Sequence, residues 1–264
     1  MSWEPSASQI VAFHEQGYLV IESLIEPSRV ALLRAAFDEL LDRWSAECSV
    51  SRERYLQVIS QWTNVWEKHP QFATQVHHPR MLAIVRGLLG VPALRLFHDH
   101  LIFKPGRAEE LRSATIPWHQ DFPFWPVDAP RAVSCWLALD DVSADSGAMR
   151  FMPGAHLEGE EPPVDFLCRQ KDWGARAADA VPIEVPAGGA VFHSCLSWHM
   201  SPPNHSVRDR RAYITIMLDA ACRWQPAHAD WHPMNKRVTV EPGQPFNEDV
   251  FPILGRDDSP AVSP

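Results

Sequence analysis

The run from Arg210 to Asp219 alternates between two kinds of side chain, and this pattern constrains the fold more than any other stretch of the chain. Successive side chains of a β-strand point to opposite faces, so the alternation predicts a strand with one face in the core. Apart from Arg210, the even-numbered face is wholly apolar: Ala212, Ile214, Ile216 and Leu218. A buried guanidinium is costly unless it meets an anion, and its planar fork suits a carboxylate. We therefore predict that Arg210, and not Arg211 on the other face, binds an acidic small molecule.

Several other stretches have the composition of short strands or amphipathic helices. Alternating or β-rich composition bounded by turn residues predicts strands at 18–21, 94–104, 132–139, 148–152 and 190–193. Apolar residues at helical spacing predict helices at 8–16, 27–47 and 79–89, of which the first ends at Gly17 and the third at Gly90. The 24 prolines and 11 tryptophans also suit many short strands with ordered loops. The predicted fold class is mainly β with flanking helices.

The composition and charge of the chain narrow the kinds of partner that it can have. With 264 residues, of which 45% are hydrophobic, the chain can bury a sizeable core, and we expect one domain. A net charge of −9 without a Lys/Arg-rich run argues against nucleic acid or an anionic membrane as a partner. The five cysteines are odd in number and form no Cys-x-x-Cys pair, and we find neither a signal peptide nor a membrane-spanning run. We expect a cytoplasmic protein with reduced thiols, monomeric or homo-oligomeric, that acts on a small molecule.

The segment Pro117-Trp118-His119-Gln120-Asp121 places an imidazole and a carboxylate two residues apart. On an extended segment these two side chains point to the same side, so they can bind one metal ion if a third ligand arrives from elsewhere. His199 is the candidate third ligand, with His193 and His205 as alternatives. Two imidazoles and one carboxylate on one face of an octahedral ion leave the opposite face open, which is the arrangement of non-haem Fe(II) oxygenases.

Three aromatic residues, Phe122, Phe124 and Trp125, follow Asp121 directly. Rings this close to a reactive centre would exclude water and pack against an apolar part of a substrate. The alternative is that they only build core. We keep all three as candidates for the substrate pocket.

Two further stretches mix polar and aromatic residues. Alternation along 94–104 would place five residues on one face: Leu94, Leu96, His98, His100 and Ile102. Because imidazole is an ordinary half-buried side chain, His98 is interpreted as a core or surface residue. The stretch 52–67 either lines a substrate entrance or is a surface segment with packed tryptophans, and its notable residues are Gln57, Gln61, Trp62, Asn64 and Trp66.

The remaining segments are predicted as loops or turns. The polar loop 107–115 precedes the metal motif and is a candidate flap over the site. The stretch 156–179 mixes charge, Pro and Gly without periodicity, so we expect a long loop that serves as a lid or a specificity element. The aspartates Asp140, Asp141 and Asp145 are predicted to form a solvated turn. Beyond Asp219 we predict coil and no chemistry.

These motifs together resemble the phytanoyl-CoA dioxygenase family of Fe(II)- and 2-oxoglutarate-dependent oxygenases. The residues that carry the resemblance cover most of the chain: 13–20, Lys104-Pro105, 119–121, 147–156, His199, Asn204 and Arg210. The resemblance implies a double-stranded β-helix, which is a jelly-roll, cupin-like core. It also implies that His119, Asp121 and His199 bind iron.

The same resemblance assigns roles to residues around the iron. The eleven residues from His199 to Arg210 match the spacing in the family, which favours His199 over the two alternative ligands. The far carboxylate of 2-oxoglutarate is expected on Arg210 and Ser201, and Trp136 and His100 stand where relatives contact this co-substrate. At the position of His100, relatives often have a methionine. The expected cofactors are therefore Fe(II), 2-oxoglutarate and O₂.

For the reaction, the resemblance implies hydroxylation of a C–H bond of a small-molecule metabolite. Related halogenases bind chloride where the carboxylate ligand would stand, and Asp121 fills that place here. The rival interpretations are a non-catalytic protein of the same fold that binds 2-oxoglutarate and metal, and a metal-dependent hydrolase or isomerase. Within one domain, 1–264, we expect a helical N-terminal support at about 1–92, a β-helix core at about 93–220 and a C-terminal extension at 221–264.

Overall fold

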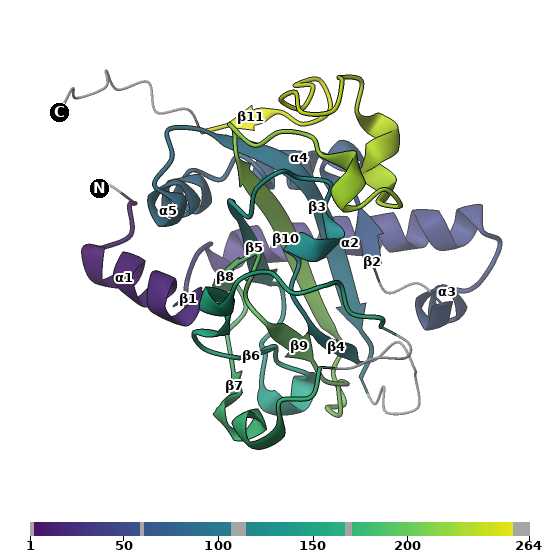
Figure 1. Cartoon of the computed structure of the whole chain (residues 1–264). Coiled ribbons are helices and arrows are strands. Elements are labelled where there is room, and N and C mark those ends of the chain that lie inside the picture. The colour runs from purple at the N-terminus through teal and green to yellow at the C-terminus, as the bar shows by residue number, and fades with distance from the viewer. Residues whose placement is uncertain (1–2, 59–60, 107–114, 167–170, 256–264) are drawn as a thin grey trace.

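The computed structural model describes residues 3–58, 61–106, 115–166 and 171–255 (Figure 1). Most of its strands form a seven-stranded antiparallel sheet, the major sheet, in the order β1-β8-β5-β10-β3-β11, with β2 paired to β3. These strands are β1 (Tyr18–Ile21), β2 (Gln61–Thr63), β3 (Leu94–Lys104), β5 (Ala132–Ala138), β8 (Ala190–Ser194), β10 (Arg210–Asp219) and β11 (Ile253–Leu254). A smaller sheet of four strands has the order β4-β9-β6-β7, with β4 (Ile116–His119), β6 (Arg150–Phe151), β7 (Val181–Pro182) and β9 (His199–Ser201). The prediction of a mainly β fold with flanking helices is confirmed.

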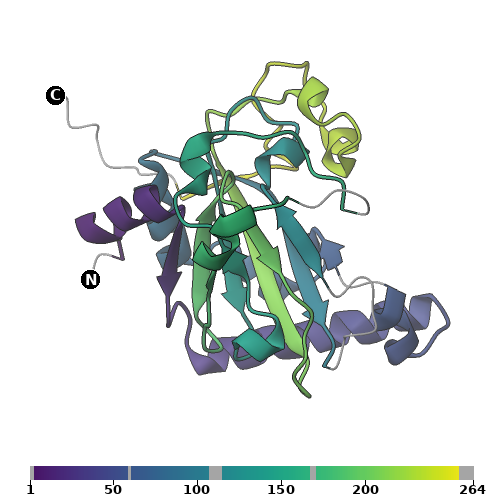
Figure 2. The ribbon, with the colours of Figure 1, turned by 60° about the horizontal axis from the view of Figure 1, so that its bottom comes forward.

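Helices cover one face of the major sheet. The α-helices are α1 (Ala7–Gln16), α2 (Pro27–Glu47), α3 (Arg52–Val58), α4 (Pro70–Gln75) and α5 (Pro79–Leu89). In both views α2 crosses the back of the sheet (Figures 1 and 2), and its apolar stripe, which includes Leu33 and Phe37, is fully buried. Ser6 caps α1 in a capping box with Gln9, and Gly17 ends it with a φ of 87°, a conformation that glycine adopts without strain. The three predicted helices therefore form at the expected places.

The short 3₁₀ helices lie in the connections between these elements. They are η1 (Val65–Glu67), η4 (Phe122–Phe124), η5 (Ala144–Ser146), η6 (Ala155–Glu158), η7 (Gly174–Asp179), η8 (Pro226–His228) and η9 (Pro233–Arg237). The predicted strand at 148–152 is shorter than expected, since only Arg150–Phe151 form β6.

The major sheet has a separate apolar core on each face. The helix-side core contains Tyr213 and Met217 of β10, together with the buried stripe of α2. The cavity-side core contains the even-numbered residues of β10, from Ala212 to Leu218. Strand β10 therefore alternates as predicted, and Arg210 lies on the face away from the helices.

Strand β3 does not keep a single phase, so the prediction of one face from Leu94 to Ile102 is wrong. The register against β10 pairs Ile216 with His98 and Met217 with Leu96, which leaves Phe97 as one extra residue in β3. Such a β-bulge reverses the faces beyond it. Leu94 and Leu96 consequently pack in the helix-side core, whereas His98, His100 and Ile102 line a cavity on the other face.

The predicted solvated turn of aspartates is also wrong for one of its members. Asp141 and Asp145 are exposed, but the Asp140 carboxylate lies 2.9 Å from the Arg211 guanidinium and 3.1 Å from that of Arg34. Two cations, one from β10 and one from α2, converge on Asp140, so this carboxylate joins the helix layer to the sheet.

The C-terminal segment 220–255 wraps over one end of the major sheet, where β11 pairs with β3 (Figure 1). Four cysteines lie in the described part of the chain, and none of them forms a disulfide. No helix in this part has both the length and the apolar character needed to cross a membrane.

Candidate metal centre

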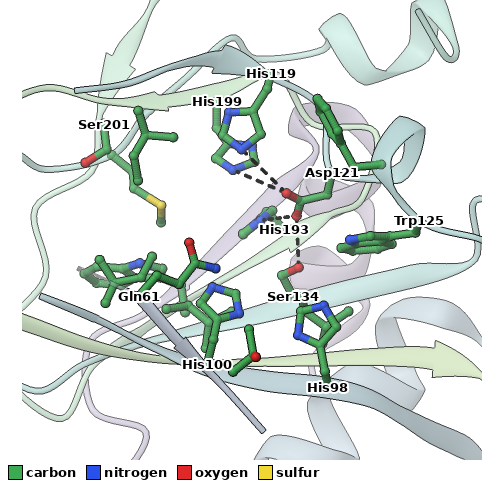
Figure 3. A pocket seen from close by; sticks show the side chains of 18 of the residues that line it. Gln61, His98, His100, His119, Asp121, Trp125, Ser134, His193, His199 and Ser201 are labelled. Carbon is green, nitrogen blue, oxygen red and sulfur yellow. Dashed lines mark hydrogen bonds and ion pairs between the residues drawn. The ribbon is translucent and has the colours of Figure 1, made fainter. Parts of the chain in front are cut away.

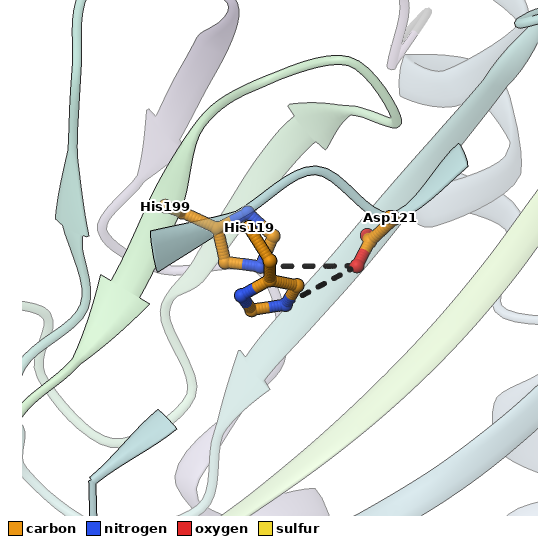
Figure 4. Close-up of side chains that lie close together, drawn as sticks. All are labelled: His119, Asp121 and His199. Carbon is orange, nitrogen blue, oxygen red and sulfur yellow. Dashed lines mark ion pairs between the residues drawn. The ribbon is translucent and has the colours of Figure 1, made fainter. Parts of the chain in front are cut away.

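Three potential metal ligands converge at one end of the smaller sheet (Figure 4). His119 ends β4, His199 begins β9, and these two residues are paired directly across the strands. Asp121 follows two residues after His119, and its Oδ1 lies 3.7 Å from Nε2 of His119 and 3.8 Å from Nε2 of His199. One ligand atom from each of the three lies within 4.8 Å of the others, which is close enough to share an ion.

Backbone hydrogen bonds set the tautomer of both imidazoles. Nδ1–H of His119 donates to the carbonyl of Pro117 at 2.8 Å, and Nδ1–H of His199 donates to that of Ser197 at 2.9 Å. The unprotonated Nε2 atoms therefore face Asp121. Burial lowers the pKa of both rings, that of His199 to about 3, so both are neutral near pH 7. Neutral imidazoles with a fixed second nitrogen are the form that metals bind.

The Asp121 carboxylate is ionised, and two hydrogen bonds hold its outer oxygen (Figure 3). Its Oδ2 accepts hydrogen bonds from Oγ of Ser134 at 3.1 Å and from Nε2 of His193 at 3.2 Å. Burial opposes ionisation, but the imidazoles of His199, His193 and His119 outweigh it, so the pKa of Asp121 lies well below its usual value. Oδ1 is thereby turned toward the two ligand imidazoles.

The two alternative ligands lie elsewhere. His193 on β8 bonds to the outer oxygen of Asp121, and His205 is exposed in the loop before β10. Two neutral nitrogens and one carboxylate oxygen fit the donor set of non-haem Fe(II). Within the described ranges this is the one cluster of at least three His, Cys, Asp or Glu residues close enough to bind a metal ion.

Arg210 is the second notable group, and it is only 1% exposed. Its Nη1 donates to the carbonyl of Gly147 and lies 3.4 Å from Oγ of Ser201, while its guanidinium stands 5.3 Å from the centre of the Trp136 ring. Its Nε is buried without a hydrogen-bond partner, and it forms no ion pair among the described residues. Burial lowers the pKa of Arg210 to about 10, so it remains a cation. Such a cation fits an anionic ligand.

The three potential metal ligands and Arg210 line the same cavity, which has a volume of about 510 Å³. The predicted co-substrate residues Ser201, Trp136 and His100 also line it. So do Phe124 and Trp125, whereas Phe122 packs in the core behind them, 4.7 Å from the ring of His228. Residues scattered over the sequence are thus gathered around one space.

The stretch 52–67 lies partly at the cavity and partly in the core. Gln61 and Thr63 of β2 line the cavity, and Trp62 packs in the helix-side core. The side chain of Gln57 and most of the candidate flap, residues 107–114, lie outside the described residues. Thr115, at the end of that flap, lines the cavity.

Several cavity residues were not predicted as site residues, and among them is His98, which was interpreted as a core or surface residue. His98 lines the cavity because of the bulge in β3, and Phe166 reaches it from the loop 156–179. The C-terminal segment, for which no chemistry was predicted, contributes Trp231, His232, Pro233 and Met234. The run Asp230-Trp231-His232 was the only signal, and without periodicity it does not show where the segment packs.

Comparison with known proteins places the chain in a family. The family described as phytanoyl-CoA dioxygenase (PhyH) matches residues 13–212. The ectoine dioxygenase of Stutzerimonas stutzeri is 27% identical over 243 residues, covering 82% of this chain and 79% of that one.

Solved structures agree with this match. The non-haem alpha-ketoglutarate-dependent carbocyclase SnoK from nogalamycin biosynthesis is 25% identical, with a TM-score of 0.76 and coverage of 95% of this chain and 96% of that one. The epimerase SnoN from the same biosynthesis is 22% identical, with a TM-score of 0.72 and coverage of 93% and 96%, which shows likeness of fold.

The family match confirms the resemblance and the double-stranded β-helix predicted from the sequence. Together with the His–Asp–His cluster, it also confirms the predicted cofactors, which are Fe(II), 2-oxoglutarate and O₂. With the matched residues covering most of its length, the chain belongs to the phytanoyl-CoA dioxygenase family.

Proposed function

We propose that this 2-oxoglutarate-dependent non-haem iron oxygenase hydroxylates a C–H bond of a small-molecule metabolite. The class of oxygenase follows from the family, and hydroxylation is the finer step that we add. One observation carries it: the carboxylate of Asp121 completes a set of three protein ligands and is held in place by Ser134 and His193. A carboxylate in that position would occupy the place that related halogenases leave for a halide.

In this proposal His119, Asp121 and His199 bind the iron, which with 2-oxoglutarate and O₂ supplies the oxidation of a C–H bond to C–OH. The protein residues prepare the ligands for this role. The carbonyls of Pro117 and Ser197 keep the two Nε2 lone pairs directed at the ion. Outer hydrogen bonds of this kind orient ligands and strengthen metal binding.

Arg210 and Ser201 are the proposed partners of the far carboxylate of 2-oxoglutarate. The guanidinium is a buried cation without an ion pair in the described structure, and a carboxylate would supply its missing partner. Trp136 of β5 lies against the guanidinium, and His100 of β3 lines the same cavity. We propose these two residues as further contacts of the co-substrate.

The aromatic residues beside the metal ligands would keep water from the reacting carbon. Phe124 and Trp125 line the cavity directly after Asp121. Excluding water strengthens the electrostatic interactions in the site and protects reactive species. An apolar part of the substrate would therefore lie against these rings.

Two rival functions are weighed against this one. A hydrolase that binds zinc at the same ligands has no use for a buried arginine without an anion, so Arg210 disfavours it. A non-catalytic binding protein would bind Fe(II) and 2-oxoglutarate without consuming them. Consumption of 2-oxoglutarate by the purified protein with Fe(II) in air separates these cases.

The reaction outcome needs a second experiment, because the carbocyclase and epimerase neighbours show that this fold supports other oxidative outcomes. Candidate metabolites are first screened for those that stimulate formation of succinate. The best one is then supplied with ¹⁸O₂ and chloride, and the product is analysed by mass spectrometry. We expect ¹⁸O at carbon. A chlorinated product, or a product that contains no new oxygen, would overturn the proposal.

A further inference from the structure

We infer that His98 and His232, an imidazole pair outside the metal centre, recognise the substrate by donating hydrogen bonds to oxygen atoms of an uncharged, ring-bearing molecule. This inference rests on the proposed function, because it names the class of substrate for the same cavity.

The pair brings together two distant parts of the chain. His98 lies on β3 just after the bulge at Phe97, and the bulge turns it toward the cavity (Figure 3). His232 caps the N-terminus of η9, in the C-terminal segment beyond the residues matched by the family. The two rings are 5.8 Å apart, and Phe97 stacks against His232 at 5.4 Å. Both imidazoles line the cavity.

Their hydrogen bonds indicate which nitrogen carries the proton. Nδ1 of His232 accepts from the backbone N–H of Met234 at 3.2 Å, so the neutral ring is protonated on Nε2. Nδ1 of His98 is buried and has no partner in the described structure. We assign the proton of the neutral His98 ring to Nε2 as part of the inference.

Neither ring carries a charge near pH 7. Burial lowers the pKa of His98 well below its usual value and that of His232 to about 4. The pair therefore presents N–H donors without a positive charge. Oxygen acceptors such as keto or hydroxyl groups match this chemistry.

The rest of the cavity argues against a charged substrate group. Among the described lining residues, the permanent charges are those of Asp121 and Arg210, which the proposed function assigns to iron and the co-substrate. Among the described residues, a buried cation or anion of the substrate would meet no partner of opposite charge, which is costly.

The mouth of the cavity supplies surfaces for a ring. Phe166 and Trp231 are large exposed apolar side chains, at 44% and 61% exposure. Both pack against Phe124, with ring centres 5.3 and 6.0 Å away, and all three line the cavity. Exposed aromatic side chains gathered at a cavity mark a binding surface. A planar or fused ring would pack against these exposed faces.

A matched set of bicyclic probes tests the inference by equilibrium dialysis against the protein loaded with Fe(II) and 2-oxoglutarate in the absence of O₂. The set comprises 1-tetralone, tetralin, tetralin-1-carboxylate and 1-aminotetralin, which differ only in the group at one carbon. We expect 1-tetralone to bind about tenfold more tightly than tetralin, and more tightly than either charged probe.

Variants of His232 identify the donor. His232→Phe keeps the ring but loses the N–H, so the preference for the ketone should fall to about threefold or less. His232→Gln retains N–H donors and should keep most of the preference. His14→Phe changes an exposed histidine of α1 that does not line the cavity, and it should keep all of it.

Equal binding of ketone and hydrocarbon, tighter binding of a charged probe, or an unchanged preference in His232→Phe would each overturn the inference. Failure to consume 2-oxoglutarate in air would reject the proposed function instead. The dialysis result does not depend on turnover, so the two failures can be told apart.

Discussion

Arg210 and Arg211 are neighbours on β10, yet the two faces of the sheet give them opposite surroundings. On the helix side, Arg211 Nε and Nη2 each lie 2.9 Å from an oxygen of Asp140, and Nη1 lies 3.4 Å from Asp38. The hydrogen bonds with Asp140 raise the pKa of Arg211. On the cavity side, Arg210 has a carbonyl and a hydroxyl but no carboxylate among the described residues, and burial lowers its pKa.

This difference separates structural charges from functional ones. A partly buried charge that helps the chain fold finds its partner within the chain, as Arg211 does. A buried charge that serves a ligand has incomplete partners in the protein alone, as Arg210 does. The metal centre follows the same rule, because Asp121 presents one oxygen to two neutral imidazoles and no cation among the described residues neutralises it.

The largest expected effect comes from a substitution on the cavity side, at Asp121. Asp121→Ala removes a metal ligand, so Fe(II) binding should weaken by more than the roughly 10- to 100-fold loss that follows when only an orienting residue is removed. Turnover should be lost while the protein remains folded. Asp140→Ala is the matched control on the helix side, and it should lower the unfolding temperature but leave the iron content unchanged. Full iron stoichiometry in Asp121→Ala, measured on purified protein, would exclude the ligand assignment.

The next effect compares the two arginines directly. Arg210→Ala should weaken binding of 2-oxoglutarate by about 2–5 kcal/mol, because it removes a charge-assisted pair in a secluded site. Arg211→Ala should keep this affinity but lower the free energy of unfolding, since Asp140 loses its nearest cation. Titration calorimetry and urea denaturation measure the two quantities. If Arg211→Ala is the variant that loses 2-oxoglutarate, the assignment of faces along β10 is wrong.

The local sequence pattern was sufficient to predict a residue's position wherever its surroundings are set by the strand or helix to which it belongs. The alternation of β10 placed Arg210 correctly, and the helix at 27–47 follows from its apolar spacing. The metal cluster was also predictable, because His119 and Asp121 are close in sequence and the family's spacing singles out His199.

Prediction failed where one inserted residue or a distant packing contact decides the outcome. The bulge at Phe97 cannot be read from 94–104 alone, because it appears only in the pairing with β10. The role of Asp140 depends on cations from two other elements, and that of His232 depends on how an aperiodic segment wraps the sheet. Interactions of this kind depend on the tertiary fold and leave no periodic signal.

The smallest effect concerns Asp99, a buried acid on the helix side that has no cation beside it in the described part of the chain. Its Oδ2 accepts from the Tyr213 hydroxyl at 2.6 Å and from the Trp66 N–H at 2.8 Å, while Oδ1 is buried without a partner in the described structure. Burial raises the pKa of Asp99 to about 7 from 3.8. The folded state thus binds this proton more tightly than the unfolded state does. Its contribution to stability is present below pH 4, falls as pH rises from about 4 to 7, and is absent above that range.

Asp99→Asn imitates the protonated acid, since the amide oxygen can still accept from Tyr213 and Trp66. The variant should therefore lose the part of the pH dependence that Asp99 contributes, a difference on the order of 1–4 kcal/mol in the free energy of unfolding between pH 4 and 8. Urea denaturation of both proteins across this range isolates the effect, because every other titrating group is common to the two. Affinity for 2-oxoglutarate should not change, since Asp99 faces the helices. Parallel stability curves would show that Asp99 is ionised in the folded protein, and the helix side would then hold a buried charge without a cation, which contradicts the distinction drawn between the two faces.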